Sequence, residues 1–186
     1  SAEALVRWNH PELGMISPAV FIPLLEDNGL ILELDRFVWR EAAARIREWK
    51  DRLGYSVPVS VNVSRIDLYD PDFIAHISDL VKEFSIRRED FLLEITESAY
   101  TEDSDVIVEN VKKLRDAGFL IEMDDFGSGY SSLNMISTLP IDVIKLDMQF
   151  IRNAFKGNGE LFGLLDRAQC AWAYPQIVEA LVKYGG

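Results

Sequence analysis

The sequence feature that most constrains the fold is a series of short apolar segments that each end in a polar side chain. These polar residues follow one another at intervals of 21 to 34 residues, at Asn62, Glu94, Asp124, Lys145 and Glu179. Most of these intervals match the length of a β-strand, a crossover helix and a second, parallel strand. The carboxyl ends of parallel strands point the same way, so these side chains are expected to gather at one rim. The series predicts an α/β fold of the TIM-like (β/α) barrel type, in which active sites lie at that rim.

An open, doubly wound sheet is the alternative architecture. Its dinucleotide-binding members carry Gly-x-Gly-x-x-Gly after an early strand, and no such fingerprint occurs here. The polar groups are also spread over many strands instead of one crevice. We therefore favour a single barrel domain over residues 1–186, a length and a hydrophobic fraction (48%) that suffice for one core.

Two strands are expected over Val57–Ser64 and Phe91–Thr96. The first places valines on one face and small polar residues on the other, and the second places Phe91, Leu93 and Ile95 opposite Leu92, Glu94 and Thr96. Helices are expected over Ser17–Gly29, from there to about Trp49, from Asp70 to about Phe84, and over Asp105–Ala117. In the second helix, Phe37 and Trp49 lie at helical spacing with Leu34, Val38 and Ile46, which predicts that the two aromatic residues lie in the core.

Composition excludes several classes of protein. The net charge of −12 argues against DNA as a partner. No apolar run approaches the roughly 20 residues that span a membrane. The single Cys170 cannot form an internal disulfide, which fits a cytoplasmic location.

The segment Gly118–Leu133 carries adjacent carboxylates, Asp124 and Asp125, after an apolar run and before a Gly-Ser-Gly loop. Neighbouring residues of a regular strand point to opposite faces, so the pair is expected to converge where the strand stops. Close carboxylates repel each other unless a proton or a cation lies between them. Most Asp-Asp pairs are solvated turns; the position at a strand end favours a metal site here.

The expected rim combines Glu3, Asn62, Glu94, Asp124 and Asp125. Their oxygen atoms are the ligand type that suits Mg²⁺ or Mn²⁺. Four carboxylates together need about two divalent ions, which predicts a two-metal site for phosphoryl chemistry. Lys145 would stabilise a developing oxyanion.

Five motifs in register resemble those of the EAL family of cyclic-di-GMP phosphodiesterases and their inactive relatives. They are Glu3-Ala4-Leu5 with Arg7-Trp8, Val61-Asn62-Val63-Ser64, Glu94-Ile95-Thr96-Glu97, Asp124-Asp125-Phe126-Gly127-Ser128-Gly129-Tyr130-Ser131 and Lys145-Leu146-Asp147. The resemblance runs to about Ile151, and residues 152–186 diverge from the family pattern.

The resemblance implies that the five rim residues are metal ligands and that the ring of cyclic di-GMP is opened to linear pGpG. It further implies a catalytic role for Lys145 and Asp125, and for Glu179 as the family's late glutamate. Substrate contacts are expected from Leu5, Arg7 and Asp147. Glu97 would anchor the Asp125–Ser131 loop, which in this family couples dimerisation to activity.

The altered tail leaves a second function class open, a cyclic-di-GMP receptor or regulatory domain of poor catalytic power. An enolase-like lyase has little support beyond shared rim chemistry. The family's last strand and the strand that normally precedes Glu-Ala-Leu are both missing, which suggests a barrel incomplete at both ends. The fading of the family pattern suggests an internal junction near Lys156–Glu160. A homodimer, and regulatory domains elsewhere in the full-length protein, complete the expectations.

Overall fold

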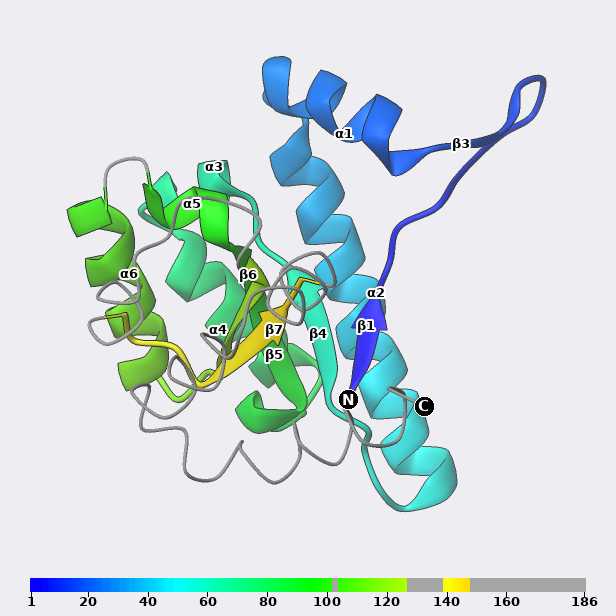
Figure 1. Ribbon diagram of the computed structural model, residues 1–186. Helices are drawn as coiled ribbons and strands as arrows, with labels where there is room; N and C mark the ends of the chain where they lie inside the picture. The colour runs from blue at the N-terminus through cyan, green and yellow to red at the C-terminus, as the bar shows by residue number, and fades with distance from the viewer. Residues whose placement is uncertain (102–103, 127–138, 148–186) are drawn as a thin grey trace, which may run out of the picture.

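The computed structural model describes residues 1–101, 104–126 and 139–147. Their central element is a five-stranded sheet in which all neighbouring strands run parallel, in the order β1-β4-β5-β6-β7 (Figure 1). The strands are β1 Ala2–Ala4, β4 Val59–Asn62, β5 Phe91–Thr96, β6 Ile121–Phe126 and β7 Val143–Leu146. Strand order follows chain order, as it does in a barrel that closes by successive βα units.

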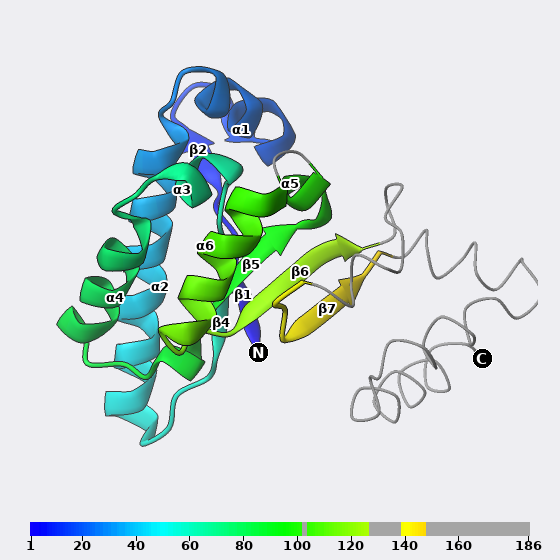
Figure 2. The same ribbon diagram turned by 90° about the vertical axis from the view of Figure 1, so that its left-hand side faces the viewer.

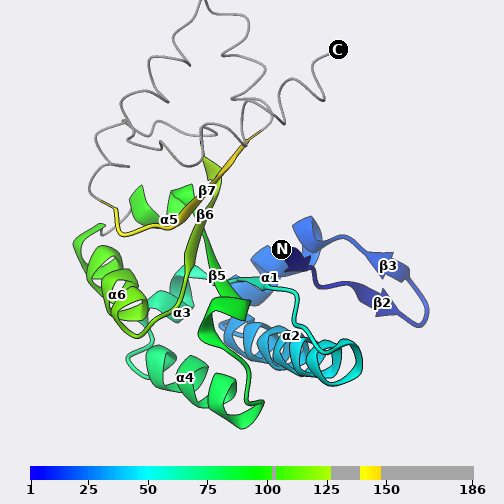
Figure 3. The same ribbon diagram turned by 90° about the horizontal axis from the view of Figure 1, so that it is seen from below.

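Alternation along the strands decides what each face of the sheet contacts. One face carries the apolar residues Val59, Val61, Leu93, Ile95 and Met123, all buried in the hydrophobic core. The helices α2 Ile31–Leu53, α4 Phe73–Glu83 and α6 Ser104–Asp116 cover that face and supply the other half of the core (Figures 2 and 3). The opposite face is left to the polar residues.

The predicted helices form near their expected bounds, for identifiable local reasons. Pro18 opens α1 (Pro18–Asp27) at a position where its missing N–H costs nothing. Gly54, at φ +79°, ends α2 in the left-handed conformation that glycine adopts without strain. No helix among the described residues is both long and apolar enough to cross a membrane.

A hairpin and two short α-helices were not predicted. A hairpin of β2 (Trp8–His10) and β3 (Gly14–Ile16) projects from the sheet, and the short helices α3 (Arg65–Tyr69) and α5 (Glu97–Thr101) follow β4 and β5 (Figure 1). Ser64 and Asp67 cap α3 reciprocally, each side chain accepting a hydrogen bond from the other residue's backbone N–H. Short helices give too few residues for a periodic pattern, so the capping pair was the signal available.

The core prediction for Phe37 was wrong, since its side chain is 60% exposed. The buried face of α2 instead contains Ile31, Asp35, Trp39 and Ile46. Trp39 packs on Phe73 of α4 and donates a hydrogen bond from Nε1 to the Asn62 carbonyl oxygen at 3.0 Å. The acidic residue Asp35 interrupts the apolar pattern of the buried face, so the apolar spacing indicated a different face.

Candidate active site at the carboxyl ends of the sheet

The inner face of the sheet, away from the helices, carries a layer of polar side chains. Strand register aligns Glu3 with Ser60, Asn62 with Glu94, and Glu94 with Glu122. Residues aligned in register on neighbouring strands project to the same face. The sheet therefore brings acids from three strands together on its inner face, where Leu92 of β5 and Val143 of β7 are also aligned with Ser60 and Glu122.

Lys145 of β7 lies among these acids. Its Nζ is 2.5 Å from Glu94 Oε2 and 3.7 Å from both Glu3 Oε2 and Glu122 Oε2. Burial lowers the pKa of the Lys145 ammonium, but the close Glu94 carboxylate and the charges of Glu122 and Glu3 outweigh burial and raise the pKa overall. The lysine is therefore a fixed positive charge within the acidic layer.

Glu94 is the most deeply buried of the predicted site residues, with 1% of its surface exposed. Burial raises the pKa of its carboxyl group to about 7, although the Lys145 ammonium opposes the shift. Neither carboxylate oxygen has a well-formed hydrogen bond within the described part of the chain. The 2.5 Å approach of Lys145 is thus an ion pair whose angles do not suit a hydrogen bond.

The sequence predicted that the strand ends at the Asp124–Asp125 pair, and this prediction was wrong. The strand continues to Phe126, and the register with β7 shifts between Met123 and Phe126, so that two residues of β6 oppose one position of β7. Asp125 takes φ +55°, the left-handed region. This β-bulge adds one residue to the strand and redirects its side chains. Burial and then the neighbouring charges of Asp124 and Asp147 raise the pKa of Asp125.

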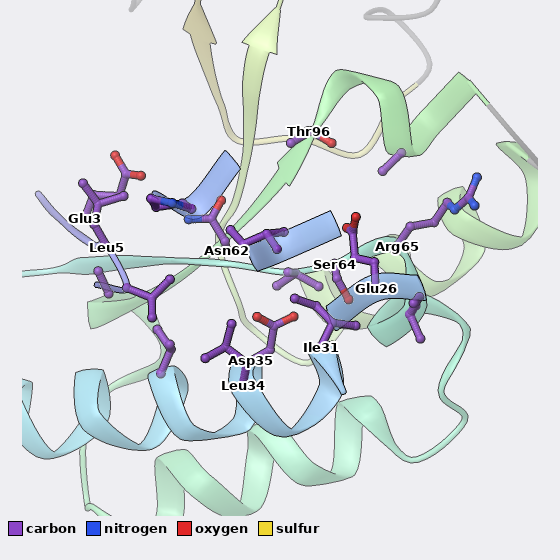
Figure 4. Close-up of a pocket in the computed structure, with 18 of the residues that line it drawn as sticks. Glu3, Leu5, Glu26, Ile31, Leu34, Asp35, Asn62, Ser64, Arg65 and Thr96 are labelled. Carbon is purple, nitrogen blue, oxygen red and sulfur yellow. The ribbon is translucent and has the colours of Figure 1, made fainter. Parts of the chain in front are cut away.

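A cavity of about 710 Å³ extends from the acidic layer toward α1 and α2 (Figure 4). Glu3, Leu5, Arg7, Asn62 and Thr96 line its rim side. In Figure 4, Glu3 and Leu5 lie at one end, Asn62 near the centre, and Asp35 rises from α2 below. Two predicted substrate contacts, Leu5 and Arg7, thus share one cavity with two predicted metal ligands.

The remaining predicted residues divide into two groups. Glu97, at the start of α5, is 2% exposed, and its charge acts on Asp125 together with that of Asp147. Glu179 and the loop beyond Phe126, which Glu97 is predicted to anchor, lie outside the described residues, as does the predicted junction near Lys156–Glu160. Within the described ranges, no three acidic, histidine or cysteine side chains are arranged around one point as ligands of a single ion.

Sequence reasoning missed Ser60 and Glu122 as members of the site. Ser60 Oγ donates a hydrogen bond to Glu122 Oε2 at 2.5 Å, and both side chains are buried. A signal was present for Glu122, because it precedes Asp124 by two residues and a strand repeats its faces every second residue. The apolar neighbours of Glu122 obscured that signal.

Comparison with known proteins identifies this arrangement. The family model described as "EAL domain" matches residues 1–167. The chain belongs to the EAL domain family. The parallel sheet is the part of this TIM-like barrel that the described residues form. EAL relatives include the cyclic di-GMP phosphodiesterase PdeR of Escherichia coli, 36% identical over 156 residues, and a cyclic di-GMP phosphodiesterase of Pseudomonas aeruginosa, 38% identical over 151 residues.

The similarity covers most of the chain but a minor part of these relatives. It extends over 84% and 81% of the chain, and over 23% and 26% of the two relatives. Among solved structures, the EAL chain resembles the PaMucR phosphodiesterase in complex with c-di-GMP, with a TM-score of 0.75 and 32% identity. That similarity covers 89% of this chain and 67% of the other.

Proposed function

We propose that this chain is a cyclic di-GMP phosphodiesterase that opens the cyclic dinucleotide to linear pGpG. In this reaction a water oxygen bonds to one phosphorus, the bond from that phosphorus to a ribose 3′ oxygen breaks, and the leaving oxygen takes a proton. The observation that carries the proposal is the acidic layer around Lys145 at the rim of an EAL sheet. The relatives named as cyclic di-GMP phosphodiesterases support the same substrate.

The proposed cofactor is Mg²⁺ or Mn²⁺, in a site for two ions. The donor chemistry fits, because the oxygens of Glu94 are buried without a hydrogen bond in the described part of the chain. Fully ionised, the carboxylates of Glu3, Glu94, Glu122, Asp124 and Asp125 and the Lys145 ammonium sum to −4, the charge that two divalent ions balance. Glu3, Asn62, Glu94, Asp124 and Asp125 would hold the ions. When bound, such ions neutralise phosphate charge and act as Lewis acids.

The protein's own residues would orient the substrate and stabilise charge. Arg7 and Leu5 line the cavity beside Asn62, so the guanidinium can pair with a phosphate while Leu5 contacts an apolar part of the ligand. Lys145, held by three acids, can stabilise charge that develops on a phosphate oxygen. We assign Asp147 to substrate binding, Glu97 to the support of the loop after Asp125, and Glu179 to the late catalytic glutamate.

A cyclic di-GMP receptor of poor catalytic power is the second candidate. It is favoured by the position of Lys145, whose ammonium lies 2.5 Å from Glu94 and 3.7 Å from Glu3, two of the carboxylates that would hold the ions. An ion on Glu94 must compete with that ammonium. A domain in which the Lys145 ammonium keeps the ion from Glu94 would bind the nucleotide without hydrolysing it.

Release of pGpG from cyclic di-GMP, measured with and without Mn²⁺, tests the phosphodiesterase assignment, and metal-free nucleotide binding by calorimetry tests the receptor. Asp124→Asn is expected to lower turnover at least about 10²-fold because it weakens metal binding. Lys145→Ala is expected to lower turnover by a similar factor while Mn²⁺ still binds. Asp51→Asn, on the exposed end of α2, is the matched control and should leave turnover unchanged.

Mn²⁺-dependent release of pGpG that Asp124→Asn abolishes would establish the phosphodiesterase. Nucleotide binding without any release, at saturating Mn²⁺, would establish the receptor instead. Because the chain spans about a quarter of each of these two relatives, we further propose that regulatory domains flank this one in the whole protein. A homodimer is also proposed, on the family resemblance of the loop after Asp125.

A further inference from the structure

Glu122 is a buried acid that the proposed chemistry does not use. It lies on the inner face of β6, directly across from Glu94 of β5, with 3% of its surface exposed. A carboxylate buried between strands is costly unless polar groups surround it. Its partners are the Ser60 hydroxyl, which donates to Oε2 at 2.5 Å, and Lys145 Nζ, 3.7 Å from the same oxygen.

The three acids around Lys145 differ in their assigned roles in the proposed metal site. Glu3 and Glu94 are assigned as ligands, whereas Glu122 is not. A divalent ion and an ammonium group repel each other when they share a carboxylate, and the repulsion is strong in a buried site. With an ion on Glu94, Nζ would be repelled from that carboxylate, and of the three acids Glu122 would remain as its partner.

We propose that Glu122 is a positioning residue that holds Lys145 in the site when metal takes Glu94. The inference rests on the proposed function. The Ser60 hydrogen bond fixes the Glu122 carboxylate on the inner face, so that its negative charge stays beside Nζ. Glu122 thus favours metal binding indirectly, because it makes the departure of Lys145 from Glu94 less costly, and it keeps the ammonium close to the reacting phosphate.

A purely structural Glu122 would fill space and affect stability without any link to Lys145. Binding of Mn²⁺ alone, measured by calorimetry on the chain without nucleotide, distinguishes the two roles. The variants are Glu122→Gln, Lys145→Met and the double variant. Gln keeps the size of the side chain and can still accept the Ser60 hydrogen bond, but it removes the charge.

We expect Glu122→Gln to weaken Mn²⁺ binding on the order of 10-fold when Lys145 is present, since contacting residues couple strongly. In the Lys145→Met background the same change should weaken binding about 3-fold or less, because only the direct attraction to the ion is lost. At saturating Mn²⁺, Glu122→Gln should lower kcat about 10-fold with KM nearly unchanged, and Glu122→Asp should restore part of kcat.

Glu109→Gln is the matched control, since Glu109 is exposed on α6 and pairs with Lys113. It should leave Mn²⁺ affinity unchanged. Equal losses of affinity for Glu122→Gln in both backgrounds would overturn the inference alone, while wild-type protein that binds no Mn²⁺ would overturn the proposed metal site as well. If Glu122→Gln fails to fold, Ser60→Ala gives the same test, because it frees the Glu122 carboxylate and should weaken binding in the Lys145 background only.

Discussion

The carboxyl pair Asp35–Asp67 beneath the cavity offers a prediction whose size follows from the structure. Asp35 is 8% exposed and Asp67 is 2% exposed. Burial, and then the hydrogen bond and charge of Asp67, raise the pKa of Asp35 to about 9. Asp67 accepts hydrogen bonds from the Ser64 backbone N–H at 3.0 Å and from its hydroxyl at 2.5 Å. The proton therefore resides on Asp35, which donates to Asp67.

Asp35→Asn is expected to stabilise the fold at neutral pH. Between pH 3.8 and about 9 the folded protein holds a proton on Asp35 that the unfolded chain has released, so stability falls as pH rises. At pH 7 the pH is about 3 units above the pKa of Asp35 in the unfolded chain, so protonating this carboxyl group on folding costs about 4 kcal/mol. Asn needs no proton and can donate to Asp67, so the variant avoids this cost. Burial of the Asn amide offsets part of the gain. The expected gain is about 2–4 kcal/mol at pH 7 and about 1 kcal/mol or less at pH 4.5.

Urea unfolding of the wild-type chain and of Asp35→Asn at pH 4.5, 6 and 7, followed by circular dichroism, measures the difference in their free energies of unfolding. The gain in unfolding free energy should grow by about 1.4 kcal/mol per pH unit. Asp79→Asn, on the exposed surface of α4, should change stability by less than about 0.5 kcal/mol at every pH. A gain that does not change with pH, or a loss at pH 7, would refute the protonated pair.

Two further predictions concern buried hydrogen bonds. Asp90 is 1% exposed and accepts from Arg87 Nε at 2.8 Å and from Ser56 Oγ at 2.6 Å, and the Arg87 hydrogen bond lowers its pKa. Asp90→Asn should cost about 1.5–3 kcal/mol at pH 7, and the cost should shrink as pH falls through the folded pKa of Asp90, as measured by urea unfolding across pH. Trp39→Phe should cost about 1–3 kcal/mol in the same assay, because the Asn62 carbonyl loses its donor.

The layout of the sheet could be predicted because alternation is a local property. The valines of β4 and the apolar residues of β5 indicated which face meets the helices, and with parallel strands this also brought Asn62 and Glu94 together. Phe37 was misplaced because helical spacing allows more than one face, and tertiary packing selected the face that includes Asp35.

The site was predictable in its members and not in its internal arrangement. That Glu3 and Glu94 share a face with Lys145 follows from strand order, which the sequence indicates. That the ammonium lies 2.5 Å from Glu94 and 3.7 Å from Glu122 depends on strand twist and side-chain rotamers, which no local pattern encodes. The bulge at Asp125 is of the same kind, because it arises from pairing with β7 and not from the aspartates themselves.

That bulge has an evolutionary consequence. Phe126 lies in the apolar core beyond the bulge, as Met123 does before it, and between them Asp124 and Asp125 oppose Lys145 alone. Removal of Asp125 would leave a regular strand with Asp124 still inward and Phe126 still packed. A deletion of one codon could therefore remove one acid from the rim while preserving the sheet. One mutational step could in this way remove the proposed activity without loss of the fold.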